Sequence, residues 1–188
     1  AQALAGDPSL IVADEPTTAL DVTIEAQILD ELLHLRDEFD LSVVLITHDL
    51  AVVRETCDRV AVMYTGELME TAFTETLFES PRHPYTVGLL QSIPRVTDDR
   101  EWLEPIEGNV PDPMDKGSGC PFADRCDSSF ELCDRPLVEY EGTGPDHGVH
   151  CHLYNDGVTT EDMTATDVSD RAAEILDRRA AADGGERR

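Results

Sequence analysis

A short apolar segment that ends in two adjacent carboxylates most constrains the fold of this chain. Leu10 to Ala13 is apolar and of strand length, and Asp14 and Glu15 follow it directly. A second apolar run, Ser42 to Thr47, is followed by His48. Continuous apolar runs of this length are typical of strands buried on both faces of a parallel sheet. The polar residues after such strands lie at the carboxyl edge of the sheet, where ligands usually bind.

The surrounding sequence predicts further alternation of strands and helices. Asp21 can cap a helix with apolar residues at helical spacing, which runs to about Phe39. A short helix over Leu50 to Cys57, a third strand over Arg59 to Tyr64 and a hairpin return over Glu67 to Glu70 follow. This order predicts an α/β fold in which the strands pair in parallel through right-handed crossovers.

Asp14 and Glu15 are the residue types that phosphoryl transfer from a nucleotide requires at a strand end. The aspartate can hold Mg²⁺, directly or through water, and the glutamate can polarise an attacking water. Alone the pattern is weak, because acids that follow a buried strand also serve to cap the next helix.

The wider pattern resembles the ABC ATPase family. Leu10 to Glu15 is similar to its Walker B strand, Thr18 to Asp21 to its D-loop, and His48 to its switch histidine. Ala1 to Pro8 is similar to the end of the helix that begins at the family's signature loop. The resemblance implies the C-terminal half of a P-loop ATPase domain, a parallel sheet with helices.

The resemblance also implies roles for four residues toward ATP and Mg²⁺. Asp14 would position Mg²⁺ with ATP, and Glu15 would be the general base for attack of water on the γ-phosphate. His48 would stabilise charge on that phosphate, and its alternative role is a core histidine that closes a strand end. Asp21 would act across a dimer interface, a role compatible with a plain helix N-cap.

Four later segments resemble the C-terminal extension of oligopeptide/dipeptide transporter ATPases: His83 to Thr86, Leu89 to Pro94, Ile106 to Pro111 and Gly119 to Cys126. We therefore expect three parts: residues 1–80 from the nucleotide-binding domain, residues 81–153 as a cysteine-rich extension, and residues 154–188 as an acidic flexible tail. The tail contains one possible helix, over Val168 to Ala181. His83 and Tyr85 are expected to start a helix that packs the extension onto the ATPase domain.

Four of the five cysteines cluster, at Cys120, Cys126, Cys133 and Cys151. Without an export signal such a cluster favours metal over disulfides, and its gaps do not fit the close pairs of structural zinc sites. Four thiolates suit an iron–sulfur cluster, and the family resemblance implies a [4Fe-4S] cluster. Two alternatives remain: a zinc site in which histidines replace some of the cysteine ligands, and two disulfides. The candidate histidines near Cys151 are His147, His150 and His152. Cys57 is expected to be a small core residue.

The charge of the chain excludes one class of partner. The formal net charge is −26, and Lys116 is the only lysine. The chain therefore has few basic side chains to neutralise the phosphate backbone of a nucleic acid. The carboxylates are spread along the chain, as in proteins that work at high salt, although an acidic patch for basic partners is an alternative. No segment has the length of a membrane span or the pattern of a secretory signal.

The family's glycine-rich phosphate loop and its Leu-Ser-Gly-Gly-Gln signature are not found in the sequence. We therefore expect a truncated part of a longer subunit, inactive alone. The resemblance implies that the intact subunit dimerises with a second, related ABC ATPase subunit at the cytoplasmic face of the membrane. The dimer would drive permease subunits that import peptides delivered by a solute-binding protein. The alternatives are an ABC ATPase without a transporter and a non-catalytic iron–sulfur or regulatory fragment.

Overall fold

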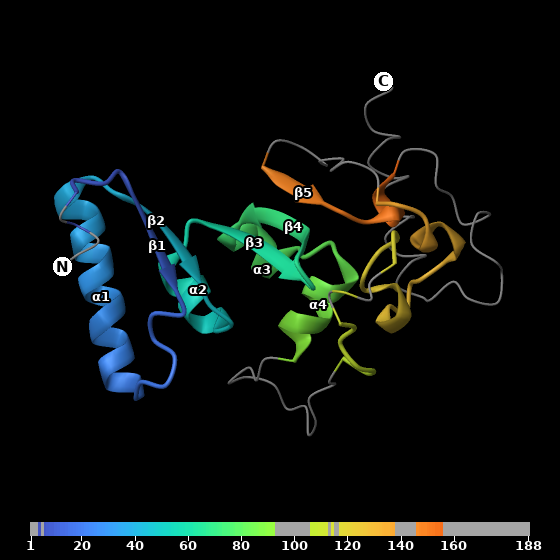
Figure 1. Ribbon diagram of the computed structural model, residues 1–188, viewed down its shortest axis with the longest axis horizontal. Coiled ribbons are helices and arrows are strands. Elements are labelled where there is room, and N and C mark those ends of the chain that lie inside the picture. The colour runs from blue at the N-terminus through green and yellow to red at the C-terminus, as the bar shows by residue number, and fades with distance from the viewer. Residues whose placement is uncertain are drawn as a thin grey trace. The chain divides into compact units, whose positions relative to one another are not determined.

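Two compact units, Ala1–Asp58 and Arg59–Arg188, make up the chain. The computed structural model describes residues 4, 6–92, 106–112, 114, 117–137 and 146–155 (Figure 1). The acidic tail beyond residue 155 and its expected helix lie outside the described residues. The division expected after residue 80 rests on the family resemblance and stays a prediction.

The first unit contains two parallel strands, each followed by a helix. Its elements are β1 (Leu10–Asp14), α1 (Val22–Phe39), β2 (Ser42–Ile46) and α2 (Leu50–Thr56). The two strands pair in parallel along their whole length, so that their carboxyl ends coincide. The predicted strand–helix–strand–helix order of this unit is therefore confirmed.

Aspartate side chains begin both helices, as expected from the preference of this residue for the N-cap. Asp21 accepts a hydrogen bond from the backbone N–H of Ile24 at 3.4 Å. Asp49 accepts from Ala51 at 2.8 Å and from Val52 at 3.3 Å. Each cap satisfies backbone donors that a helix leaves unpaired at its first turn.

One face of the two-stranded sheet is exposed among the described residues. Burial alternates along β1 and β2, and Val12, Val44 and Ile46 keep 60%, 46% and 48% of their surface in contact with solvent. The prediction that both faces of these strands are buried is therefore wrong for this part of the chain. Parallel strands are stable when elements cover both faces, and the residues that the structure describes leave the second face exposed.

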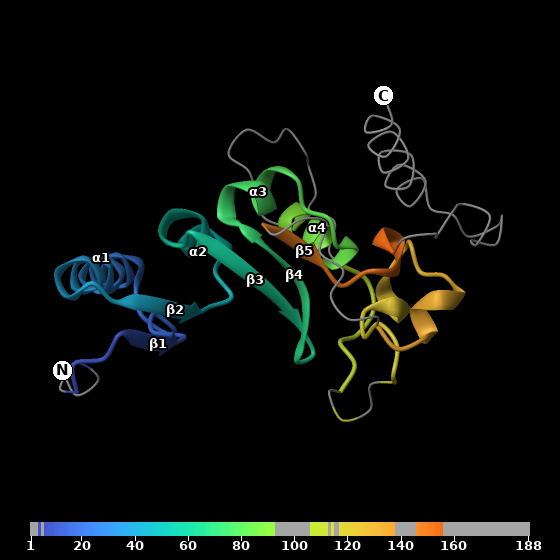
Figure 2. The same cartoon turned by 90° about the horizontal axis from the view of Figure 1, so that it is seen from above.

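The second unit is built on an antiparallel sheet of three strands, β3 (Arg59–Tyr64), β4 (Glu67–Phe73) and β5 (His147–Val149), in the order β3-β4-β5. The helices α3 (Thr74–Glu79) and α4 (Pro84–Gln91) follow β4 (Figures 1 and 2). The expected hairpin return is confirmed, whereas β5 was not predicted.

The expectation that the third strand would continue the parallel sheet is wrong. β3 pairs antiparallel with β4, with Tyr64 opposite Glu67. The two residues of the connecting turn, Thr65 and Gly66, both have positive φ, at 45° and 83°. Two such residues make the tight turn whose twist matches a hairpin, so local pairing determines the partner of β3.

Aromatic packing joins the hairpin to the cysteine-rich segment within the second unit. The buried residues Tyr64, Met69 and Phe122 form one cluster, against which Tyr85 packs. The ring of Tyr64 lies 5.4 Å from that of Phe122 in an edge-on arrangement and 4.7 Å from that of Tyr85. Edge-on and tilted ring pairs add stabilisation beyond the apolar area that they bury.

A buried carboxylate connects three segments of this unit. Glu70 on β4 is fully buried, and its Oε1 accepts hydrogen bonds from the backbone N–H of Arg82 at 2.8 Å and from Nε2 of His147 at 2.6 Å. Its Oε2 accepts from the backbone N–H of His83 at 2.9 Å. A buried carboxylate is tolerated when donors surround it in this way.

No helix in the part of the chain that the structure describes is both long and apolar enough to cross a membrane.

Replacement of Glu70 by alanine is expected to lower the free energy of unfolding of the second unit by about 3–5 kcal/mol, because three buried donors lose their acceptor. Near-ultraviolet circular dichroism during urea denaturation measures this, since all four tyrosines lie in the second unit. Glu79→Ala, at an exposed position that ends α3, is the control and should change little. Equal stability of the two variants would contradict the structural importance of Glu70.

Candidate functional site

The parallel register of β1 and β2 brings the predicted catalytic residues together. Asp14 is opposite Ile46 in the sheet, and the backbone N–H of Glu15 donates to the carbonyl of Ile46 at 2.8 Å. His48 follows β2 at the same edge, and its Nδ1 lies 3.3 Å from Oε1 of Glu15. The structure therefore places a carboxylate and an imidazole in contact at the carboxyl edge of the sheet.

Thr18 holds the second oxygen of Glu15. Its hydroxyl donates to Oε2 of Glu15 at 2.7 Å. The hydrogen bond from Thr18, followed by that from His48, lowers the pKa of Glu15, so the carboxylate is ionised at neutral pH. Glu15 also has a φ of 43°, in the left-handed region that is unfavourable for a side chain larger than glycine. Sequence reasoning had placed Thr18 in the D-loop but had given it no contact with Glu15.

Asp14 ends β1 directly before Glu15, Asp21 precedes α1, and both are exposed. Asp21 caps α1, which is the plain role that the sequence also allowed. The side chains of Glu15 and His48 are 46% and 78% exposed. The edge can therefore orient a water or contribute carboxylate oxygens to a cation, but the residues described here do not enclose a reacting group.

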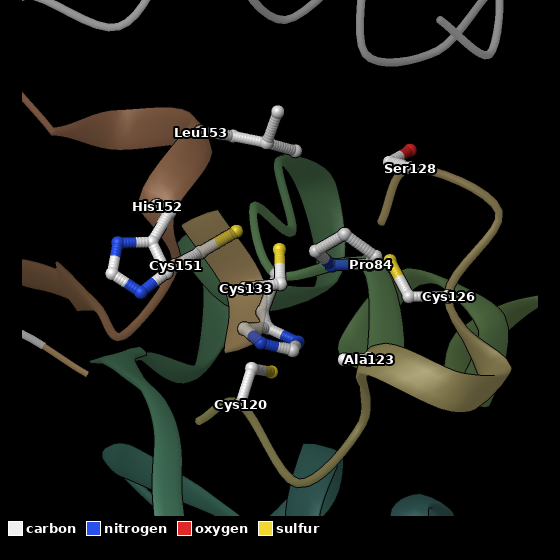
Figure 3. Close-up of a pocket in the computed structure, with 10 residues that line it drawn as sticks. Pro84, Cys120, Ala123, Cys126, Ser128, Cys133, Cys151, His152 and Leu153 are labelled. Atoms are coloured by element: carbon white, nitrogen blue, oxygen red, sulfur yellow. The ribbon is translucent and has the colours of Figure 1, made fainter. Parts of the chain in front are cut away.

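The second candidate site is a small cavity in the second unit, with a volume of about 10 Å³. Figure 3 shows the four predicted ligands on its wall, contributed by separate segments. The wall consists of His83, Pro84, Cys120, Ala123, Cys126, Ser128, Cys133, Cys151, His152 and Leu153. All five cysteines of the chain are free thiols, so the disulfide alternative is not what the structure contains. Cys57 ends α2 in the other unit and has no part in the cavity.

Short helical turns position the sulfurs. The 3₁₀ turns Ala123–Arg125, Glu131–Asp134 and His152–Tyr154 carry or adjoin the cysteines. The backbone N–H of Cys120 donates to the carbonyl of Cys133 at 2.8 Å and so closes one wall. Gly119 permits this approach, because a Cβ there would meet the carbonyl of Cys133 and lie 2.8 Å from the carbonyl carbon of Asp134.

Burial favours the neutral form of these thiols. It raises the pKa of Cys120 to about 11 and that of Cys126 to about 12, and it raises the pKa of Cys133 and Cys151 as well. Neighbouring cysteines raise the pKa of Cys120, Cys126 and Cys151 further. Thiolates at all four positions therefore require a cationic centre to offset their charge.

The arrangement does not suit a single metal ion. Within the described ranges, no group of three or more histidine, cysteine, aspartate or glutamate side chains is disposed to hold one. Zinc requires all its ligands at about 2.0–2.3 Å from one point. Of the histidines proposed as substitutes, His147 is bonded to Glu70, whereas His152 lines the cavity.

Sequence reasoning missed the place of His83 on this wall, whereas His152 was among its candidate ligands. His83 was expected to start a helix, and it does cap α4, since its Nδ1 accepts from the backbone N–H of Tyr85 at 3.0 Å. The same side chain lines the cavity. Proline at the first position of α4 is a signal for the cap, but no sequence signal brings His83 to cysteines at least 37 residues away.

Comparison with known proteins identifies relatives of both parts of the chain. Residues 69–133 match the family model described as "Oligopeptide/dipeptide transporter, C-terminal region". The chain is 50% identical over 142 residues to a putative peptide import ATP-binding protein of Brucella abortus (strain 2308), covering 76% of this chain and 43% of that protein. It is 47% identical over 153 residues to the dipeptide transport ATP-binding protein DppD of Bacillus subtilis (strain 168), covering 81% and 46%.

A third relative is the oligopeptide transport ATP-binding protein OppD of Haemophilus influenzae, 48% identical over 133 residues that cover 71% of this chain and 41% of that protein. The chain thus spans less than half the length of these relatives. Among solved structures, cbiO1 from Clostridium perfringens is 28% identical and covers 39% of this chain and 30% of that chain. Its TM-score of 0.37 is too low for a conclusion about the fold.

Gly119→Ala is expected to destabilise the second unit by about 1–3 kcal/mol, because the added methyl group collides with backbone rather than with a movable side chain. Gly117→Ala is a matched control, since a Cβ there meets nothing within 4 Å. Thermal unfolding followed through the tyrosine signal compares the two variants. A melting temperature for Gly119→Ala at or above that of Gly117→Ala would show that the segment at Gly119 does not pack closely against the backbone of Cys133 and Asp134.

Proposed function

We propose that this chain, whose residues 69–133 belong to the oligopeptide/dipeptide transporter C-terminal region family, is part of the ATP-hydrolysing subunit of a peptide importer. The contact between Glu15 and His48 supports the proposal, because a carboxylate and an imidazole meet at the carboxyl edge of a parallel sheet, where ligands usually bind. The relatives named for peptide import support the transport role, and they align with both units of this chain.

In the proposed reaction, Glu15 orients a water and accepts its proton as the water attacks the γ-phosphate of ATP. Thr18 holds Oε2 of this carboxylate through a hydrogen bond. Its Oε1 lies beside the imidazole of His48. His48 then donates a hydrogen bond to the phosphate, where negative charge develops. The exposed carboxylate of Asp14 offers the oxygen ligand that Mg²⁺ prefers. When bound, Mg²⁺ neutralises charge on the phosphates.

The remaining parts of the site are proposed to come from outside this sequence. A glycine-rich loop would cradle the phosphates, and the segment that carries it would cover the exposed apolar face of β1 and β2. Asp21 is proposed to face a second ABC ATPase subunit, which differs from this one but is related to it. The pair would bind permease subunits at the cytoplasmic face of the membrane and would depend indirectly on a solute-binding protein.

The cysteine-lined cavity is proposed to hold a [4Fe-4S] cluster through Cys120, Cys126, Cys133 and Cys151. Four thiols on one wall provide the donor set. A cluster distributes its ligands over several irons, so it does not require that the sulfurs converge on one point. When bound, the cluster supplies the cationic iron that keeps the thiolates deprotonated. The cysteines would thereby tie together separate segments of the second unit.

Glu15→Gln is expected to reduce ATP hydrolysis by the assembled intact subunit by about 10²–10⁴-fold, because the amide cannot accept the proton of the attacking water. Binding of ATP should change by no more than about twofold, since the substitution keeps the shape of the side chain. Glu31→Gln, at an exposed position of α1, is the control. Hydrolysis at the wild-type rate by the Glu15 variant would contradict the proposed role.

Anaerobic preparation with iron and sulfide is expected to give a coloured protein that absorbs visible light through thiolate-to-iron charge transfer. Cys126→Ser should lower the iron and sulfide content, whereas Cys57→Ser should leave it unchanged because Cys57 is not on the cavity wall. Absorption spectra and metal analysis measure both. A colourless protein with one equivalent of zinc would exclude the cluster.

A further inference from the structure

Two imidazoles on the wall of the cysteine-lined cavity are held in the same tautomer. Nδ1 of His83 accepts a hydrogen bond from the backbone N–H of Tyr85 at 3.0 Å. A ring nitrogen that accepts carries no proton, so the proton of this neutral imidazole is on Nε2. His83 is 1% exposed, and its backbone N–H is bonded to Glu70, which fixes the position of the residue beside the cavity.

His152 shows the same arrangement from the other end of the cysteine-rich segment. Its Nδ1 lies 2.9 Å from Nδ2 of Asn155, an amide nitrogen that can only donate. Nδ1 of His152 therefore accepts, and Nε2 carries the proton. The residue is 5% exposed, and its Nε2 is buried with no hydrogen-bond partner. A buried donor without a partner is costly and calls for a missing acceptor.

The acceptors that side chains of the wall can offer to these donors are the sulfurs of four cysteines and the hydroxyl of Ser128. The wall contains four cysteines, and a neutral thiol is only a weak acceptor. A sulfur that carries negative charge, as a thiolate on iron or as a sulfide, accepts far more strongly. Two N–H donors on a wall of four thiols are thus complementary to an anionic sulfur centre. Hydrogen bonds to such sulfurs are among the factors that set the reduction potential of a cluster.

We propose that His83 and His152 donate hydrogen bonds from Nε2 to the sulfurs of the cluster and thereby raise its reduction potential. The inference rests on the cluster proposed above. Reduction adds negative charge to the sulfurs, so the donors stabilise the reduced form more than the oxidised form. Both histidines act as positioning and tuning residues, and the four cysteines remain the ligands.

Amide substitutions can test the N–H donors of the two histidines separately from the helix cap that His83 provides. Asparagine is a favoured N-cap residue, so His83→Asn keeps an acceptor for Tyr85 but has no group at the position of Nε2. His152→Asn likewise removes the donor, and His152→Gln places an amide N–H near that position. His34→Asn, on the exposed surface of α1, is the control.

The experiment uses the full chain after anaerobic reconstitution, and the reduction potential is measured by titration of the visible absorption. We expect each asparagine variant to change the ratio of reduced to oxidised cluster at a fixed potential by about tenfold toward the oxidised form, roughly 59 mV for one electron. His152→Gln should recover part of the shift. Asparagine variants with full iron content and the wild-type potential would overturn the inference.

A second measurement needs no substitution and therefore does not depend on the folding of a variant. Pulsed electron paramagnetic resonance of the reduced wild-type cluster, with ¹⁵N-labelled histidine, should detect couplings from histidine nitrogens and from exchangeable protons. A cluster that forms but shows neither coupling overturns this inference alone. A chain that takes up no iron and sulfide overturns the cluster as well, while the proposed ATPase role is judged separately by the Glu15 variant.

Discussion

The carboxylate of Glu70 is the interaction on which the second unit depends. From β4 it accepts hydrogen bonds from the segment before α4 and from His147 on β5, and so it joins parts of the chain that lie up to 77 residues apart. One of its donors is the backbone of His83, whose side chain caps α4 and lines the cysteine cavity. The shape of the cavity thus depends on a buried charge that is tolerable only because donors surround it.

The first unit depends on a simpler constraint, the parallel register of β1 with β2. This register aligns the ends of the two strands, so that Glu15 and His48 meet although 33 residues separate them. Thr18 then fixes the carboxylate from the following loop. The contact is open to solvent on one side, and the neighbouring strands expose apolar side chains. Both features fit the proposed site, to which further elements of an ATPase domain would be added.

Local features of the sequence predicted most of the elements. Apolar runs indicated β1 and β2, and Asp21 was expected to cap α1, as it does. The adjacency of Glu15 and His48 followed from strand order together with the family resemblance. Features that depend on distant segments could not be predicted: the pairing of β5, the donors around Glu70 and the place of His83 on the wall of the cysteine-lined cavity. The hairpin of β3 with β4 was predicted correctly from the turn at Gly66, whereas the expectation that β3 also continues the parallel sheet was wrong, because β1 and β2 form a separate sheet.

We propose that the four cysteines hold one centre that contains several metal ions rather than a single ion. X-ray absorption at the iron edge of the anaerobically reconstituted chain tests it most directly, since the method reports the neighbours of each iron. The account predicts a first shell of sulfur alone and a short iron–iron distance. A mixed shell of nitrogen and sulfur without a neighbouring metal would contradict it, and would instead indicate a single-ion site that includes histidine.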